Sequence, residues 1–139
     1  MAGEEEALRK LSSELNYLND QSNLISNNLS LLSSHRNELA ISKITLEGLK
    51  DIKPGNEILI PIGAGNFVKG TITDVGTVIT TLARDVTMEK TIDETITKLD
   101  ETLKEVEKNL GQKEATLQNI RARMNEIEMK AEEIMQKQK

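Results

Sequence analysis

The sequence contains no cysteine and almost no aromatic residues, since Tyr17 and Phe67 are the only two and tryptophan is absent. Without cysteine, disulfides, thiolate catalysis and cysteine-based metal sites are excluded. Aromatic side chains contribute much of the buried area of compact cores. A chain of 139 residues with 1% aromatics is therefore not expected to form a stand-alone globule around a substrate pocket.

The sequence also lacks long apolar runs and an excess of positive charge. No apolar run approaches the roughly 18 residues of a membrane span, and the first residues lack the basic and apolar regions of a signal peptide. The net charge of −5 disfavours nucleic acid, which requires a basic patch, and anionic membrane surfaces. We therefore expect a cytoplasmic protein that binds neither nucleic acid nor membranes.

Two long segments, 4–52 and 91–137, carry a seven-residue apolar repeat, which is the signature of a coiled coil. In the first segment the repeat is formed by Leu8, Leu11, Leu15, Leu18, Ile25, Leu29, Leu32, Leu39 and Leu46, with polar Ser22, Arg36 and Lys43 at the remaining a positions. In the second it is formed by Ile92, Ile96, Leu99, Leu103, Val106, Leu110, Leu117, Ile120, Met124, Ile127, Ala131 and Ile134, interrupted by Lys113.

The two helical segments have similar lengths of roughly 45 residues, or about 70 Å each. Lys53-Pro54-Gly55 is expected to end the first helix, and Thr91 with Glu94 matches a capping box at the start of the second. Antiparallel pairing within one chain is favoured because the connection raises the effective concentration of the two helices. The alternative is that each helix pairs with another chain.

The central block 56–89 predicts two β-hairpins. Gly63-Ala64-Gly65 supplies the first turn, and a second hairpin turns around Arg84-Asp85. Isolated hairpins are marginally stable and have exposed edges, so we expect this block to assemble with other subunits. The predicted oligomerisation residues are Ile58, Ile60, Ile62, Phe67, Val68, Ile72, Val78, Leu82, Val86 and Met88.

No catalytic constellation emerges, and we expect no enzyme activity, metal or cofactor. The only histidine, His35, lies off the apolar repeat and is expected on a solvated helix face. The Gly63–Val68 segment has a superficial likeness to a dinucleotide loop, but it lacks the third glycine and precedes a strand, so the helix N-terminus that binds phosphate is missing.

Methionines gather toward the shared end of the two helical segments, where Met124, Met129 and Met135 join Met1. Seam packing explains Met124, whereas Met129 and Met135 fall outside the repeat. Flexible, polarizable methionine side chains suit contact with varied apolar partners. Seam packing and client contact both remain open as explanations of this cluster.

The order of these segments, together with ILIPIGAGNFVKGTI in the first hairpin, resembles the alpha class of prefoldin subunits. The resemblance covers essentially the whole chain and is most specific over Ile58–Ile72, which is similar to the family's Val-Pro-Gly-Ala-Gly-x-Phe block. The second turn departs from the pattern, because Leu82-Ala83-Arg84-Asp85-Val86 stands where alpha subunits usually have a glycine-rich turn. This departure leaves open a divergent, gamma-type subunit that assembles with itself.

The resemblance implies one prefoldin-like domain over residues 1–139, mainly α with a small β region. Its antiparallel coiled coil would be joined by two β-hairpins that oligomerise into a β-barrel platform. It also implies an ATP-independent chaperone subunit, with beta-class subunits or copies of itself as partners, that delivers unfolded clients to a group II chaperonin. Near their free ends the helices are expected to splay and bind clients. The implied client-binding residues are Leu8, Leu11, Leu15, Met124, Ile127, Met129, Ile134 and Met135. The alternative is a structural filament or scaffold built on the same platform.

Overall fold

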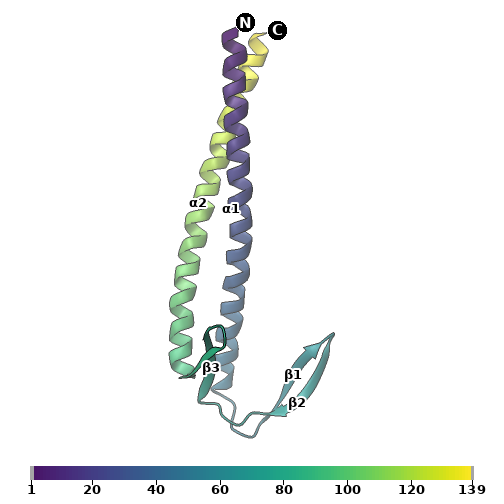
Figure 1. Cartoon of the computed structure of the whole chain (residues 1–139), viewed down its shortest axis with the longest axis vertical. Coiled ribbons are helices and arrows are strands. Elements are labelled where there is room, and N and C mark those ends of the chain that lie inside the picture. Colours follow the sequence, from purple (N-terminus) through teal and green to yellow (C-terminus); the bar gives the residue numbers. More distant parts are fainter. Residues whose placement is uncertain (1, 139) are drawn as a thin grey trace. The chain divides into compact units, whose positions relative to one another are not determined.

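The computed structural model describes residues 2–138 and contains two long helices separated by four strands (Figure 1). Helix α1 spans Ala2–Leu49 and helix α2 spans Ile92–Lys137. The strands between them are β1 (Glu57–Gly63), β2 (Asn66–Thr71), β3 (Thr77–Ala83) and β4 (Val86–Thr91). The fold class expected from the sequence, two long helices with two central hairpins, is confirmed.

The chain divides into two compact units. The first combines Met1–His35 with Val106–Lys139, and the second is the continuous segment Arg36–Glu105. In the first unit Glu14 pairs with Arg123, and Glu4 accepts a hydrogen bond from Gln138. In the second unit Lys43 pairs with Asp100 and Lys50 with Asp93. In both units later residues of α1 face earlier residues of α2, so the two helices are antiparallel.

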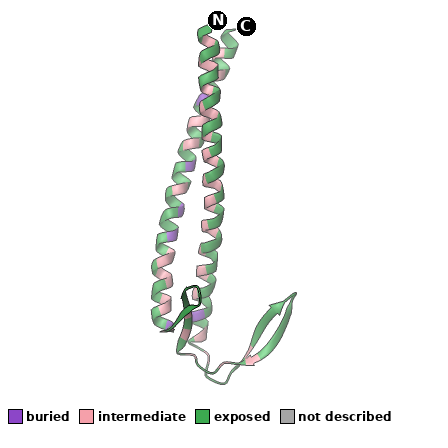
Figure 2. Cartoon of the chain, viewed as in Figure 1, coloured by how far each residue is buried: buried purple, intermediate pink, exposed green. Residues whose placement is uncertain are grey.

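The buried residues of both units belong to the seven-residue repeat, and Figure 2 draws them in purple. They are Val106, Leu110, Leu117 and Ile127 in the first unit and Leu46 and Ile92 in the second. A two-helix structure buries only a seam, because each helix has one neighbour and the rest of its surface faces solvent. The seam therefore takes the place of a globular core.

The helix ends differ slightly from the sequence prediction. Helix α1 ends at Leu49 rather than Ile52, and the next residues form tighter turns, with the Ile52 amide donating to the Leu49 carbonyl at 3.2 Å. Helix α2 begins at Ile92, and the Glu94 amide donates to Thr91 Oγ1 at 3.1 Å. Thr91 thus acts as the N-cap that the sequence predicted.

Both hairpins are antiparallel, have two-residue turns, and show a register shift one residue before the turn, at Ile62 and at Leu82. In the first turn Ala64 and Gly65 have φ values of 52° and 78°, the combination that type I′ turns require. In the second turn Asp85 has φ of 59°. Aspartate tolerates this left-handed conformation better than most residues, so the turn forms without a glycine.

Candidate functional site

The first hairpin carries apolar side chains on both of its faces. Ile58 lies opposite Gly70 and Ile60 opposite Val68 in the strand register, and cross-strand partners share a face. The alternate pairs place Leu59 opposite Lys69 and Pro61 opposite Phe67 on the other face. A hairpin that is apolar on both faces cannot bury either face by itself.

Most large apolar side chains of the two hairpins are exposed to solvent, and Figure 2 draws both hairpins almost entirely in green. Of the predicted oligomerisation residues, Ile58, Ile72 and Val78 are half-buried, and the others are exposed: Ile60, Ile62, Phe67, Val68, Leu82, Val86 and Met88. Contiguous exposed apolar surface marks an interaction site. These residues remain candidates for assembly contacts.

Two further exposed side chains, Leu59 and Ile79, were missing from the predicted set. They are 62% and 72% exposed, and each lies on the face opposite to its selected strand neighbours, Ile58 and Ile60 for Leu59 and Val78 for Ile79. In β1 and β3 the predicted oligomerisation residues were chosen at alternate positions, starting from Ile58 and Val78, and the positions between them were left out. Counting apolar residues at every strand position, rather than at alternate ones, would have included both.

An apolar groove of about 650 Å³ lies between the helix ends of the first unit. Its apolar lining comes from α1 through Leu8, Leu11 and Leu15, and from α2 through Ile127, Met129 and Met135. Met129 is 63% exposed and Met135 54% exposed, so both flexible side chains are accessible. The groove thus contains six of the eight residues named as client contacts, whereas Met124 and Ile134 lie outside its lining and Met1 lies outside the described residues.

The sequence led us to expect that the helices splay apart at this end. In the structure they stay packed together, so this expectation is wrong. Ile127 is only 1% exposed, which makes it the most completely buried large side chain among residues 2–138. The seam stays closed because its apolar repeat continues to Ile134 and because an ion pair joins the helices beside it. Leu8, Leu11, Leu15, Met124 and Ile134 are half-buried rather than exposed.

The ion pair beside Ile127 joins Arg123 of α2 to Glu14 of α1 through two nitrogens. Arg123 Nε lies 2.9 Å from Glu14 Oε1, and Nη2 lies 3.2 Å from Oε2. This bidentate geometry fixes orientation as well as distance. The hydrogen bonds to Glu14 and then Glu126 raise the pKa of Arg123 further above its usual value, so its guanidinium group keeps its positive charge.

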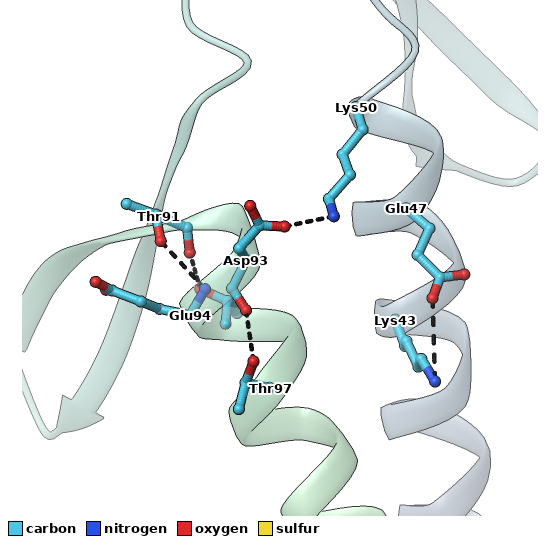
Figure 3. A network of polar contacts seen from close by, with 8 residues as sticks. Lys43, Glu47, Lys50, Thr91, Asp93, Glu94 and Thr97 are labelled. Carbon is cyan, nitrogen blue, oxygen red and sulfur yellow. Dashed lines mark hydrogen bonds and ion pairs between the residues drawn. The ribbon is translucent and has the colours of Figure 1, made fainter.

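Polar contacts hold the helix ends of the second unit together, and Figure 3 shows those around Lys50 and Asp93. Lys50 of α1 pairs with Asp93 in the first turn of α2, where a carboxylate also complements the helix dipole. Lys43, at a seam position, approaches Asp100 to 2.6 Å. The hydrogen bond and the charge of Asp100 raise the pKa of Lys43. Lys43 also approaches Glu47 of its own helix, but its pairing with Asp100 of the facing helix favours one register of the two helices.

The described residues contain no group of three or more His, Cys, Asp or Glu side chains arranged to hold a metal ion. His35 is exposed on α1. No helix within residues 2–138 combines the length and apolar character needed to cross a membrane. The features with functional potential are therefore the exposed hairpins and the groove.

Comparison with known proteins matches the chain to prefoldin subunits. A family model described as prefoldin subunit matches residues 18–137. The chain is 40% identical over 96 residues to prefoldin subunit alpha 1 of Thermococcus kodakarensis, and 43% identical over 99 residues to prefoldin subunit alpha of Thermococcus onnurineus. Each match covers 69% of this chain and 66% of the relative, so the chain spans slightly less than two thirds of the curated relatives it matches.

A cryo-EM structure of filamentous PFD from Methanocaldococcus jannaschii has a similar fold. The TM-score is 0.54, with 17% sequence identity, and the match covers 88% of this chain and 95% of the other. At this identity the likeness concerns the fold alone. The family model covers most of the chain, including both hairpins and all of α2, and with the two relatives it shows that the chain belongs to the prefoldin subunit family.

Proposed function

We propose that this prefoldin subunit contributes to an ATP-independent, cytoplasmic chaperone that binds unfolded proteins at the ends of its helix pair. The chaperone would prevent client aggregation and deliver clients to a group II chaperonin, without catalysing a reaction. The observation that carries this proposal is the apolar groove with Met129 and Met135 exposed at its edge. Methionine side chains adapt to many apolar shapes, as a site for varied unfolded chains requires.

The hairpins supply the second part of the proposal, which is assembly. Their exposed apolar side chains need covering, and pairing with hairpins of other subunits would cover them. The partners would be beta-class prefoldin subunits, copies of this chain, or both. Several weak grooves held in one assembly would bind a client by avidity, which explains how a shallow groove could retain an unfolded chain.

Client binding at the groove is tested with the double variant Met129→Ser/Met135→Ser. Suppression of light scattering by a guanidine-denatured test enzyme should weaken relative to the unaltered assembly. The matched control is Leu31→Ser, which removes an exposed apolar side chain of α1 that does not line the groove. A deletion of residues 1–15 and 124–139 should abolish protection. Equal protection by the deleted assembly, with its number of subunits unchanged, would show that clients bind elsewhere.

The second candidate function is a structural filament or scaffold, with client binding secondary. It is favoured by the similar fold of a protein described as filamentous and by the unusual Arg84-Asp85 turn in the second hairpin. Light scattering of the purified chain over a hundredfold concentration range, with and without a beta-class subunit, separates the two. A fixed mass in the presence of the partner supports a closed chaperone. A mass that keeps rising with concentration supports an open filament.

A further inference from the structure

The groove in the first unit has an acidic side as well as an apolar floor. Glu128 and Glu132 of α2 both line it, and both are exposed. From α1 the groove is lined by Leu8, Leu11, Leu15 and Ser12, and no Lys or Arg belongs to its lining. The groove therefore presents negative charge next to apolar surface.

These two glutamates differ from their neighbours in lacking basic partners. Neither has Lys or Arg three or four positions away on either side, the separations at which helical side chains meet. By contrast, Glu126 lies 3.1 Å from Arg123, and Glu133 has Lys137 four residues later. Within residues 2–138, the ion pairs of this unit involve Glu6, Glu14 and Glu126 but neither glutamate of the groove.

Glu128 and Glu132 also repel each other, because like charges four residues apart on a helix are destabilising. A cation placed between or beside them would relieve this repulsion. The adjoining apolar lining excludes water from part of the surroundings, which strengthens attraction between charges relative to open water. An arginine or lysine side chain meets both requirements, because its apolar stem packs against apolar surface while its charged end reaches a carboxylate.

We propose that this groove selects unfolded segments in which an apolar residue has Lys or Arg within about three positions, a span of about 10 Å in an extended chain. The inference rests on the proposed client-binding function and specifies its substrate class. The apolar side chain packs against Leu11, Leu15 and Met129, and the basic side chain lies against Glu128 or Glu132. Segments with acidic residues beside the apolar one are disfavoured by the same two carboxylates.

The test uses the full-length assembly and three fluorescein-labelled 15-residue peptides that are identical except at four positions. These positions carry Lys, Gln or Glu between shared leucines. In fluorescence anisotropy titrations at low salt, the Lys peptide should bind tightest and the Glu peptide weakest. Exposed ion pairs have modest effects, so a difference of about three- to tenfold between the Lys and Gln peptides is expected. The difference should shrink at 0.5 M NaCl because salt screens exposed charges.

Two double variants localise the preference. Glu128→Gln/Glu132→Gln should reduce binding of the Lys peptide to that of the Gln peptide while leaving the Gln peptide unaffected. Glu128→Lys/Glu132→Lys should reverse the order and favour the Glu peptide. The matched control is Glu101→Gln/Glu105→Gln, which makes the same change of charge at the same spacing on α2, outside the groove, and should retain the wild-type preference.

The possible outcomes separate this inference from the function on which it rests. If all three peptides bind with similar affinity, or if the control pair changes the preference as much as the groove pair, the charge selection is wrong and client binding stands. If none of the peptides binds and aggregation of a denatured enzyme is not suppressed, both proposals fail. Circular dichroism of the Gln variant should show unchanged or increased helix content, because the repulsion between the two carboxylates has been removed.

Discussion

Ala64 occupies a conformation that ordinarily belongs to glycine or asparagine. Its φ of 52° lies in the left-handed region, where the Cβ atom of an L-residue crowds the following carbonyl. The strain is confined to one residue, because its turn partner Gly65 accepts a positive φ without such a clash. The first hairpin is therefore formed despite a residue that does not favour its turn.

Replacing Ala64 with glycine should stabilise the first hairpin by about 0.5–1 kcal/mol, since the relief of strain exceeds the added flexibility of the unfolded chain. Denaturation of the full chain followed by NMR signals of the hairpin would measure the change. Ala83→Gly is the control, because Ala83 directly precedes the second turn but is not among the positive-φ residues. It should destabilise its hairpin, and an equal effect of the two substitutions would refute the explanation by strain.

Asp74 gives the chain a local dependence on pH. Its Oδ2 accepts a hydrogen bond from the Thr77 hydroxyl at 2.6 Å, and its Oδ1 accepts one from the Gly76 amide at 2.7 Å. These bonds, the hydroxyl first, lower the pKa of Asp74 from 3.8. Because the folded value is the lower one, the stabilisation is fully present above pH 3.8 and is lost as the pH falls through the folded pKa.

An NMR titration of the Asp74 carboxyl should find its pKa below 3.8 in the folded chain. In Thr77→Val the pKa should rise toward 3.8, because the largest cause of the shift is removed. Thr80→Val changes the same residue type in the same strand without touching Asp74 and should leave the titration unaltered. A Thr77→Val titration that matches the unaltered chain would mean that the hydroxyl has no part in the shift.

At the scale of the elements, the closed end of the helix pair depends on Ile127. Truncation of a buried aliphatic side chain loses its transfer free energy and leaves a cavity. Ile127→Ala should therefore lower the free energy of unfolding of the first unit by about 2–4 kcal/mol. Urea denaturation followed by circular dichroism measures the loss.

Met129→Ala is the matched comparison for that experiment, because Met129 lies two residues away on the same helix but is mostly exposed. Its effect should stay within about 0.5 kcal/mol, as is usual for surface positions. Similar losses for both variants would indicate that the helix ends are open in solution. Hydrogen exchange of the Ile127 amide would then be fast rather than protected.

The helices could be predicted well from the sequence because their signals are local and repeated. The spacing from Leu8 to Leu46 defined one helix, and the hydroxyl of Thr91 marked the start of the next. The burial of Ile127 was predicted incorrectly, since it depends on which residues face it from α1 and on the Arg123–Glu14 pair. Those contacts join residues more than a hundred positions apart, and spacing within one helix carries no information about them.

The hairpins show a second reason for incomplete prediction. Their strands and turns were recognised from alternation and from the Gly63–Gly65 segment, yet Leu59 and Ile79 were missed as exposed apolar residues. Alternation identifies two faces but does not say which of them meets a partner. Which face is buried depends on the partner subunits, and the sequence of this chain carries no direct information about them.

At the scale of the whole molecule, assembly is predicted to depend on apolar hairpin residues. Ile79→Lys should lower the mass of the assembly, because a charged side chain cannot be buried against a neighbouring hairpin without a large desolvation cost. Thr81→Lys introduces the same charge two residues along β3, on the same face, where the original side chain is already polar. Multi-angle light scattering after gel filtration would compare the two, and an equal loss of mass would show that charge alone prevents assembly.

The two hairpins are built alike. Each joins a seven-residue strand to a six-residue strand through a two-residue turn, and in each the register of strand pairing shifts just before the turn. If each hairpin meets one neighbour, the subunit has a valence of two. A divalent unit makes a ring when successive rotations add up to a full circle and an endless strand when they do not. The short connection from Ile72 to Gly76 lies between the two hairpins, so its length and stiffness would help decide between closure and growth.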